Sequence, residues 1–270
     1  MESQPISEFI RRLAVRENNV LTLAGTGPNG TAQYPILREL GRERLSGLDH
    51  VNLISASCVS YFMYIAAMEG GLIVEGYRNY EARVRRLHQG GLGRLLKYLL
   101  LRQHKKRALF CSEQLRKTLA IFLDQQFLAQ PLSHFDDNIR CHSYCRVAGQ
   151  FVVITPQSHP AMTVEDVCLA CCSIPFLHGA FDYAEHCLID PMFSKQFTQL
   201  RRRITQVPAN HLYANIKYDG EYRNILFVKN HARRFPVMAN FADFFYLCAG
   251  IPNRTIARTH LNNLRLAQMA

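Results

Sequence analysis

Apolar and polar positions follow one another along the chain in blocks typical of buried strands joined to amphipathic helices. An apolar run over Asn19–Ala24 predicts a buried strand, which is followed by a glycine-rich turn over Gly25–Gly30. From Tyr34 onward the apolar positions recur at helical spacing. A second apolar run over Val51–Ser55 leads through a tight turn into another helical pattern near Tyr61. This repetition predicts a right-handed βαβ unit.

The remaining pattern predicts more elements of both kinds. Helices are expected over Glu8–Arg16, over Ser112–Phe127, from a Thr163 cap to just before Pro175, and over 242–249 and 255–267. Strands are expected over Phe151–Thr155, Cys187–Ile189 and Asn224–Val228. Alternating strands and helices favour an α/β fold with a mainly parallel sheet covered by helices on both faces. A length of 270 residues predicts one domain over 1–270.

Composition narrows the class of protein. With 48% apolar and 20% charged residues, the chain is neither disordered nor collagen-like. Its 32 Lys and Arg against 21 Asp and Glu leave a net charge of +11, which indicates an anionic partner. The most apolar stretch, Leu53–Met68, is shorter than the ~20 residues that span a bilayer. Glutamates in the first 18 residues predict no secretion signal, and nine cysteines predict reduced thiols. We expect a cytoplasmic protein, with peripheral membrane contact as an alternative.

Much of the positive charge lies in one leucine-rich segment. Residues 77–107 contain ten Lys and Arg against Glu81 alone, which gives 10 − 1 = +9. Leucines from Leu92 to Leu100 form an apolar stripe, which predicts a helical insertion. Such a helix packs on the core with its basic face in water, or else it covers an apolar pocket or an anionic membrane. The membrane hypothesis rests on Arg94, Lys97 and Arg102.

Ser57 is the first candidate for chemistry. It lies in the turn between a buried strand and a helix, where a hydroxyl is held near the positive end of the helix dipole. Backbone amides of Thr26 and Gly27 in the glycine-rich turn are suited to bind an oxygen that becomes negative when a serine attacks an acyl carbon. Pro28 has no N–H and cannot contribute.

Three motifs together resemble the patatin-like acyl hydrolases. Gly25–Gly30 is similar to the family's G-G-G-x-R/K-G turn, and Ser55–Val59 to its G-x-S-x-G elbow. Cys171–Phe176 and Cys187–Pro191 are similar to its late helix end and its strand leading to an Asp motif. The resemblance covers about two thirds of the chain, from Asn19 to Pro191.

The resemblance implies a three-layer α/β/α sandwich and a serine acyl hydrolase. Ser57 would be the nucleophile and Asp190 the base, with an oxyanion hole at Gly25, Thr26 and Gly27. The implied substrate is a fatty acyl ester or thioester, carried by a lipid or an acyl carrier, and neither cofactor nor metal is needed. An acyltransferase using the same dyad is an alternative.

Departures from the family pattern favour a second alternative, a catalytically disabled binding or regulatory protein. Ser55 and Val59 replace the elbow glycines, Asn29 replaces the basic residue of the first turn, and Pro191 follows Asp190 where the family has glycine.

Other residue groups suggest other chemistry. Cys58 beside the elbow is interpreted as a small core residue. A zinc site would need two cysteine pairs, with His142 and Cys172 as alternates; the pairs are Cys141 with Cys145 and Cys168 with Cys171. We interpret the second pair as core residues.

His178 and His186 are interpreted as surface or loop residues rather than bases. The sequence contains no recognisable nucleic-acid module, so nucleic acid is an unlikely partner.

Overall fold

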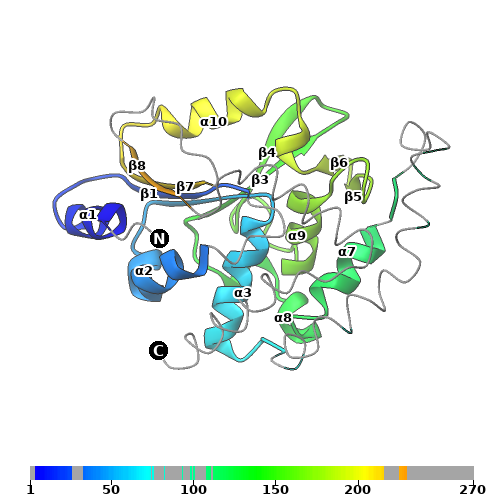
Figure 1. Cartoon of the computed structure of the whole chain (residues 1–270), viewed down its shortest axis with the longest axis horizontal. Helices are drawn as coiled ribbons and strands as arrows, with labels where there is room; N and C mark the ends of the chain where they lie inside the picture. Colours follow the sequence, from blue (N-terminus) through cyan, green and yellow to red (C-terminus); the bar gives the residue numbers. More distant parts are fainter. Residues whose placement is uncertain are drawn as a thin grey trace.

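A mixed β-sheet forms the centre of the protein (Figure 1). The computed structural model describes residues 4–25, 33–73, 108–110, 112–215 and 225–229, and the single residues 75, 82, 93, 98 and 100. Eight strands are ordered β5-β6-β3-β2-β1-β7-β8, and β4 pairs with β3. They are β1 (Asn19–Leu23), β2 (His50–Ile54), β3 (Ile139–Cys145), β4 (Gln150–Ile154), β5 (Phe181–Tyr183), β6 (His186–Ile189), β7 (Asn210–Asn215) and β8 (Ile225–Lys229).

The expectation of a mainly parallel sheet holds for only part of it. Strands β3, β2, β1, β7 and β8 run parallel, whereas β4, β5 and β6 pair antiparallel. The turn between β3 and β4 spans only residues 146–149, and so short a connection can join only antiparallel neighbours. The sheet is therefore parallel at the β1–β2 pair, where the candidate site begins, and antiparallel at the β5–β6 edge.

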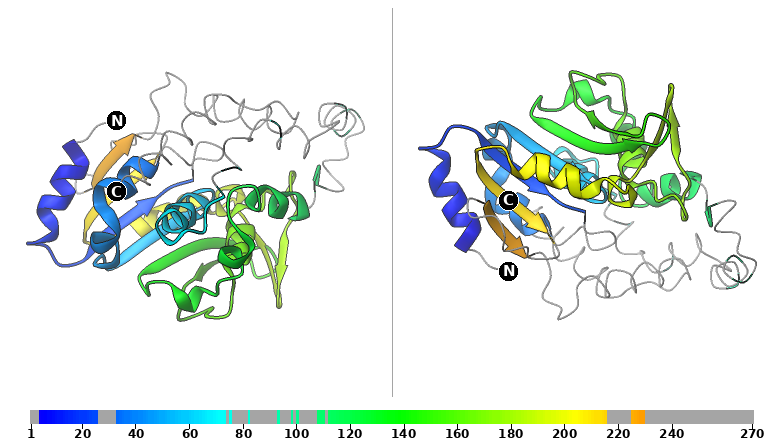
Figure 2. Two further views of the ribbon diagram at one scale, coloured as in Figure 1. Left: turned by 90° about the horizontal axis from the view of Figure 1, so that it is seen from below. Right: turned by 90° about the horizontal axis from the view of Figure 1, so that it is seen from above.

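Helices lie on both faces of the sheet (Figures 1 and 2). Figure 1 shows α2, α3 and α9 below the sheet and α10 above it, and the right panel of Figure 2 shows α10 crossing the strands. This arrangement makes the protein α/β and is compatible with a three-layer sandwich. The helices are α1 (Gln4–Leu13), α2 (Tyr34–Ser46), α3 (Ser57–Glu69), α7 (Ser112–Leu119), α8 (Gln125–Leu128), α9 (Val164–Cys172) and α10 (Phe197–Thr205), with 3-10 turns η3 (Leu132–His134) and η4 (Pro191–Phe193).

The two faces of the sheet bury different side chains. Leu21 and Leu23 join the large core beneath α2, α3 and α9. Ile54, at the end of β2, packs instead against Leu200 and Ile204 of α10. Successive residues of a strand point to opposite faces, so Asn52, two residues before Ile54, also faces α10. The face under α10 is thus less apolar than the face under α3.

Local sequence signals explain where several helices begin. Thr163 and Asp166 form a capping box at the start of α9, as the Thr163 cap predicts. The single helix expected over Ser112–Phe127 is instead two helices, because Asp124 caps a new one: its side chain accepts a hydrogen bond from the Phe127 amide at 2.6 Å. The expected helices over 242–249 and 255–267, and most of segment 77–107, lie outside the described residues.

Four elements carry too weak an apolar pattern to be recognised in the sequence: β3, β5, β7 and α10. In β3, His142 and Ser143 are buried with hydrogen-bond partners, so the strand lacks an apolar run. In α10 the buried side of a helix rich in arginine is marked by Leu200 and Ile204, with the partly buried Phe197 packed against them. None of the helices in the described part of the chain is long and apolar enough to cross a bilayer.

Candidate functional site

The turn between β2 and α3 holds Ser55 in an unusual backbone conformation. Its φ is +58°, a left-handed value that non-glycine residues rarely adopt. The turn is closed by the Cys58 amide, which donates to the Ser55 carbonyl at 3.0 Å. Ser55 directly follows the last residue of β2 and lies at the amino end of α3. Its side chain is therefore placed at a sharp bend near the positive end of a 13-residue helix.

Asp190 follows β6 and is held by the first turn of η4. The residue is 1% exposed. Its Oδ1 accepts a hydrogen bond from the Met192 amide at 2.9 Å, and its own amide donates to the Ser173 carbonyl at 2.9 Å. Pro191 fixes the backbone immediately after it. The Asp190 backbone is thus held by the Ser173 carbonyl, and one oxygen of its carboxylate is held by the Met192 amide.

Ser55 and Asp190, which are 135 residues apart in the sequence, are in contact. The Ser55 hydroxyl donates to Asp190 Oδ2 over 2.5 Å. Burial raises the pKa of Asp190 from 3.8 to about 7, although the hydrogen bonds from Ser55 and Met192 lower it. A carboxylate with such a pKa exchanges its proton near neutral pH, which is the range that suits a general base.

Ser57, the serine expected to pair with Asp190, lies elsewhere in the structure. It is fully buried, its Oγ accepts from the Ile54 amide at 2.6 Å, and the carbonyl oxygens of Leu23 and Ile54 are both 2.7 Å away. These contacts tie the ends of β1 and β2 together. The hydrogen bonds of the Ser57 hydroxyl are thus all to the main chain, and the serine that the structure brings to Asp190 is Ser55.

The sequence contained a signal for Ser55. Strand β2 ends at Ile54, so Ser55, which is 5% exposed, is the first residue beyond the strand and takes the central position of a strand-to-helix elbow. Assigning Ser55 to the strand moved the expected elbow two residues too far along the chain.

The glycine-rich turn approaches Ser55 at its first residue. A Cβ atom on Gly25 would lie 2.7 Å from the Ser55 Cβ and would also overlap the Met192 sulfur. Gly25 is thus in contact with both the serine and the turn after Asp190, where no side chain fits. Thr26 and Gly27, the other expected oxyanion donors, lie outside the described residues.

Gln33, which follows the glycine-rich turn in sequence, is hydrogen-bonded to Ala24, which precedes it. This buried residue precedes α2, and its Nε2 donates to the Ala24 carbonyl at 2.7 Å. Position 33 was not among the candidates drawn from the sequence, since a lone glutamine carries no motif. The bond anchors the residue just before Gly25.

A second buried polar group crosses the face of the sheet under α10. His142 Nε2 lies 3.0 Å from Asn52 Oδ1, Asn52 Nδ2 donates to Thr22 Oγ1 at 3.3 Å, and Thr22 Oγ1 lies 2.8 Å from His211 Nε2. We call these four residues the polar chain. Burial lowers the pKa of His142 and of His211 to about 4. Both histidines are therefore neutral at pH 7.

The cysteines of the described residues all carry free thiols. Cys58 is fully buried in the main core, as expected, and burial raises its pKa. Cys168 and Cys171 belong to the same core. Within the described ranges, no group of three or more His, Cys, Asp or Glu side chains is arranged to hold a metal ion.

The other candidates fall outside the site or outside the described chain. His178 Nδ1 accepts from the Ile174 amide at 3.4 Å, and His186 lies 3.7 Å from Glu185. The described partners of the Asp190 carboxylate are Ser55 and Met192. Arg94, Lys97 and Arg102 are not among the described residues.

Comparison of the chain with protein-family models, with curated proteins and with solved structures finds no significant match.

Proposed function

We propose that this protein is a serine hydrolase of fatty acyl esters or thioesters, with Ser55 as nucleophile and Asp190 as base. The observation that carries the proposal is the 2.5 Å hydrogen bond from the Ser55 hydroxyl to the buried Asp190 carboxylate, made at a strand-to-helix bend. With the elbow centred on Ser55, the resemblance to patatin-like hydrolases keeps its order: glycine-rich turn, serine elbow, late aspartate. The proposal includes their three-layer fold.

The new register moves the two elbow departures from Ser55 and Val59 to Leu53 and Ser57. Ser57 now takes the place of the second elbow glycine, where helix and strand approach closely. Its small side chain fits there because its hydroxyl bonds to the ends of β1 and β2. Val59 no longer lies at a motif position. The first elbow position becomes Leu53, which is buried in the main core.

The proposed reaction moves one proton between two side chains. Ser55 Oγ attacks the acyl carbon while its proton passes to Asp190 Oδ2, and the carbonyl oxygen becomes negative. When the bond to the leaving alcohol or thiol breaks, that proton passes to the leaving group. Water then attacks the acyl-enzyme, gives its proton to Asp190, and releases the acid as Ser55 regains a proton.

Two features of the described chain stabilise the developing negative charge. The positive end of α3 is directed at the turn that carries Ser55. The main chain at Gly25 lies against Ser55, so the Gly25 turn is the proposed source of oxyanion donors. Removing one such donor typically costs about 3 kcal/mol of transition-state stabilisation.

A fluorophosphonate probe tests this assignment, because it reacts with an activated serine hydroxyl. We expect labelling of the wild-type protein on the peptide that contains Ser55, and none of Ser55→Ala. Ser57→Ala is the matched control, two residues away at the start of α3, and it should still be labelled although its removal leaves main-chain groups unpaired. Labelling that survives in Ser55→Ala, or a folded wild type that is not labelled, contradicts the proposal.

A further inference from the structure

Large apolar side chains gather at the surface beside Asp190. Met192 and Phe193 of η4 are each 38% exposed, and Phe176, in the segment after α9, is 41% exposed. The rings of Phe176 and Phe193 contact one another edge to face, with centroids 5.4 Å apart. A cluster of exposed aromatic and methionine side chains indicates contact with an apolar partner.

The chain that follows this cluster is basic and carries no acidic residue. From Pro191 to Val207 there is no Asp or Glu, whereas Lys195, Arg202 and Arg203 are exposed. Several arginines elsewhere in the described chain form ion pairs with glutamate: Arg11 with Glu8, Arg42 with Glu69, and Arg116 with both Glu113 and Glu165.

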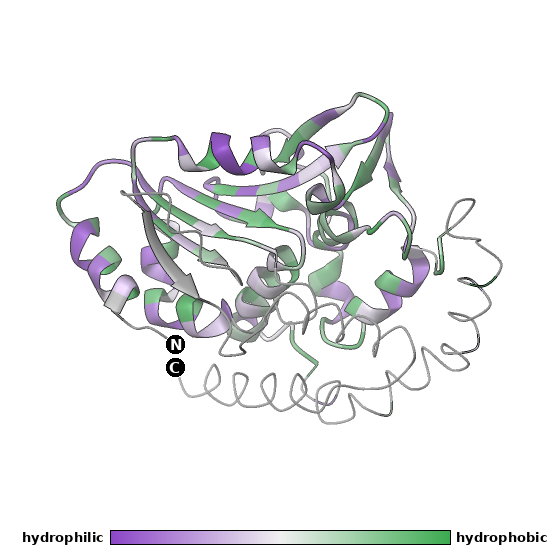
Figure 3. Ribbon diagram, turned by 45° about the horizontal axis from the view of Figure 1, so that its top comes forward, coloured by the Kyte–Doolittle hydropathy of each residue, from purple (hydrophilic) through white to green (hydrophobic). Residues whose placement is uncertain are grey.

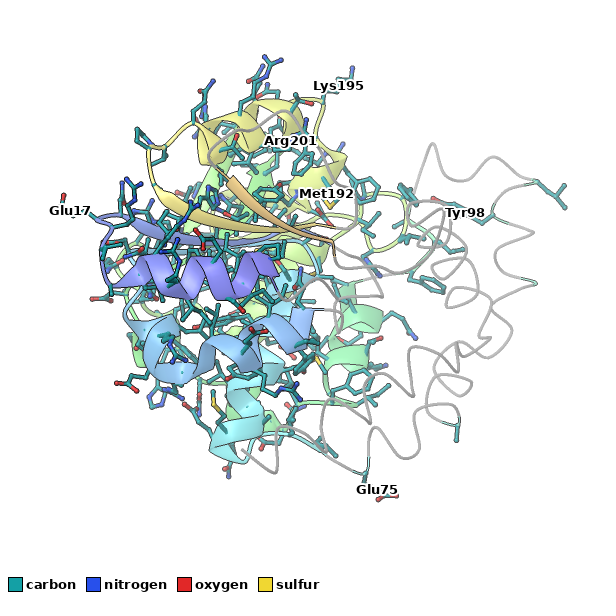
Figure 4. All side chains as sticks on the ribbon, turned by 60° about the vertical axis from the view of Figure 1, so that its left-hand side comes forward. Glu17, Glu75, Tyr98, Met192, Lys195 and Arg201 are labelled. Atoms are coloured by element: carbon teal, nitrogen blue, oxygen red, sulfur yellow. The ribbon has the colours of Figure 1, made fainter. Side chains whose placement is uncertain are left out.

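Helix α10 separates this charge from the core. Leu200 and Ile204 pack towards Ile54, and hydrophilic residues occupy the outer side of the helix (Figure 3). In Figure 4, Lys195 and Arg201 are labelled on the α10 side of the molecule together with Met192. Lys195 is only two residues after Phe193, and η4 contacts α10. Apolar and basic side chains thus adjoin on one continuous stretch.

We propose that η4, Phe176 and the outer side of α10 form a docking surface for a bilayer that contains anionic phospholipid. Met192, Phe193 and Phe176 enter the boundary between headgroups and acyl chains, and Lys195, Arg202 and Arg203 contact lipid phosphates. Nucleic acid fits less well, because the two phenylalanine rings pack against each other and methionine has no ring to stack on a base.

Docking by this surface brings lipid to the proposed dyad. The Met192 amide binds Asp190, and the Met192 sulfur lies beside Gly25. Only this step, the delivery of a lipid ester to Ser55, rests on the proposed function. Binding to the bilayer does not require the reaction.

Vesicle sedimentation of the full chain carrying Ser55→Ala tests the surface without consuming lipid. We expect binding to vesicles of equal phosphatidylcholine and phosphatidylglycerol, and much weaker binding to phosphatidylcholine alone. Lys195→Glu/Arg202→Glu/Arg203→Glu should weaken binding by about a hundredfold, since each basic residue near an anionic surface contributes about fivefold. Phe176→Ser/Phe193→Ser should weaken binding even at high salt.

The matched control is Arg16→Glu/Arg38→Glu/Arg146→Glu, which alters three exposed arginines elsewhere and changes the net charge equally. It should retain most of the binding. The proposal is overturned if wild-type protein does not bind these vesicles, if the control loses as much as the α10 variant, or if a single-stranded oligonucleotide displaces the protein from them. Hydrolysis of a soluble p-nitrophenyl butyrate, measured with Ser55 intact, tests the proposed function separately, and circular dichroism checks folding.

Discussion

Asp190 and the histidines of the polar chain are buried to a similar extent, and burial shifts their pKa values in opposite directions. Asp190 is 1% exposed and its pKa rises to about 7; His142 and His211 are 4% and 1% exposed and their pKa values fall to about 4. In both regions the neutral form is favoured, as desolvation requires. The two regions differ in the pH at which their groups titrate. The histidines stay neutral at pH 7, whereas Asp190 changes charge near that pH.

The neighbours of each group explain what it is suited to do. The polar chain links four adjacent parallel strands and has no strained backbone, so it specifies how the sheet packs under α10. In the Ser55–Asp190 pair, the backbone of Ser55 has a left-handed φ, and the Asp190 carboxylate is costly to bury in its charged form. Burial alone therefore does not distinguish the two regions; Asp190 differs because its pKa lies near 7 and its carboxylate accepts the hydrogen bond of the Ser55 hydroxyl.

The largest effect is expected when Asp190 becomes neutral. Asp190→Asn keeps an acceptor for the Met192 amide but removes the proposed base, so the proposed hydrolysis should fall by roughly a thousandfold or more. The free energy of unfolding, in contrast to the activity, should increase in this variant. Because the folded pKa is raised from 3.8 to about 7, the folded state favours the protonated acid, and this contribution is lost as pH rises through 7.

The free energy of unfolding of Asp190→Asn should therefore exceed that of the wild type at pH 8, with the difference shrinking towards pH 5. Urea unfolding across this range measures it. A variant that is both inactive and less stable at every pH would show that Asp190 is a structural residue.

The next largest effect concerns acid stability of the polar chain. Each histidine has a folded pKa below its ordinary 6.5, so its stabilising contribution is complete above pH 6.5 and is lost as pH falls towards 4. The loss amounts to about 3 kcal/mol per histidine, at 1.36 kcal/mol per pKa unit. Asp190 has the opposite pH dependence, so the measurement is cleanest in Asp190→Asn.

Urea unfolding of Asp190→Asn at pH 7 and pH 4.5, with and without His142→Gln, isolates this contribution. Glutamine retains a donor for Asn52, so the variant should fold and should lose less stability on acidification than its parent. An equal loss of unfolding free energy on acidification, with and without His142→Gln, would mean that protonation of His142 does not affect stability.

A smaller effect is expected at Gly25. Gly25→Ala places a Cβ against the Ser55 Cβ at 2.7 Å, so the elbow or the turn must shift. A displacement of this kind at reacting groups lowers activity by about a hundredfold. Gly25→Ala/Met192→Ala removes the flexible sulfur but not the Ser55 contact, so it should remain impaired. Recovery of hydrolysis in that double variant would show that only Met192 constrains the turn.

Sequence reasoning identified the elements with strong apolar runs. Strands β1 and β2, the start of α9 and the position of Asp190 follow from apolar periodicity, the Thr163 cap and motif order. Strand β3 did not, since its buried His142 and Ser143 are stabilised by partners distant in sequence. The choice between Ser55 and Ser57 depended on where β2 ends, and a shift of one residue there changes which hydroxyl faces Asp190.

The left-handed φ of Ser55 has a consequence for protein engineering. Glycine is the residue that most easily adopts that backbone angle, and a side chain held there costs of order 1 kcal/mol or more. A designer who optimised thermal tolerance alone would put glycine at position 55. The native chain instead has serine at this bend, which destabilises the folded state relative to glycine but keeps a hydroxyl group at that position.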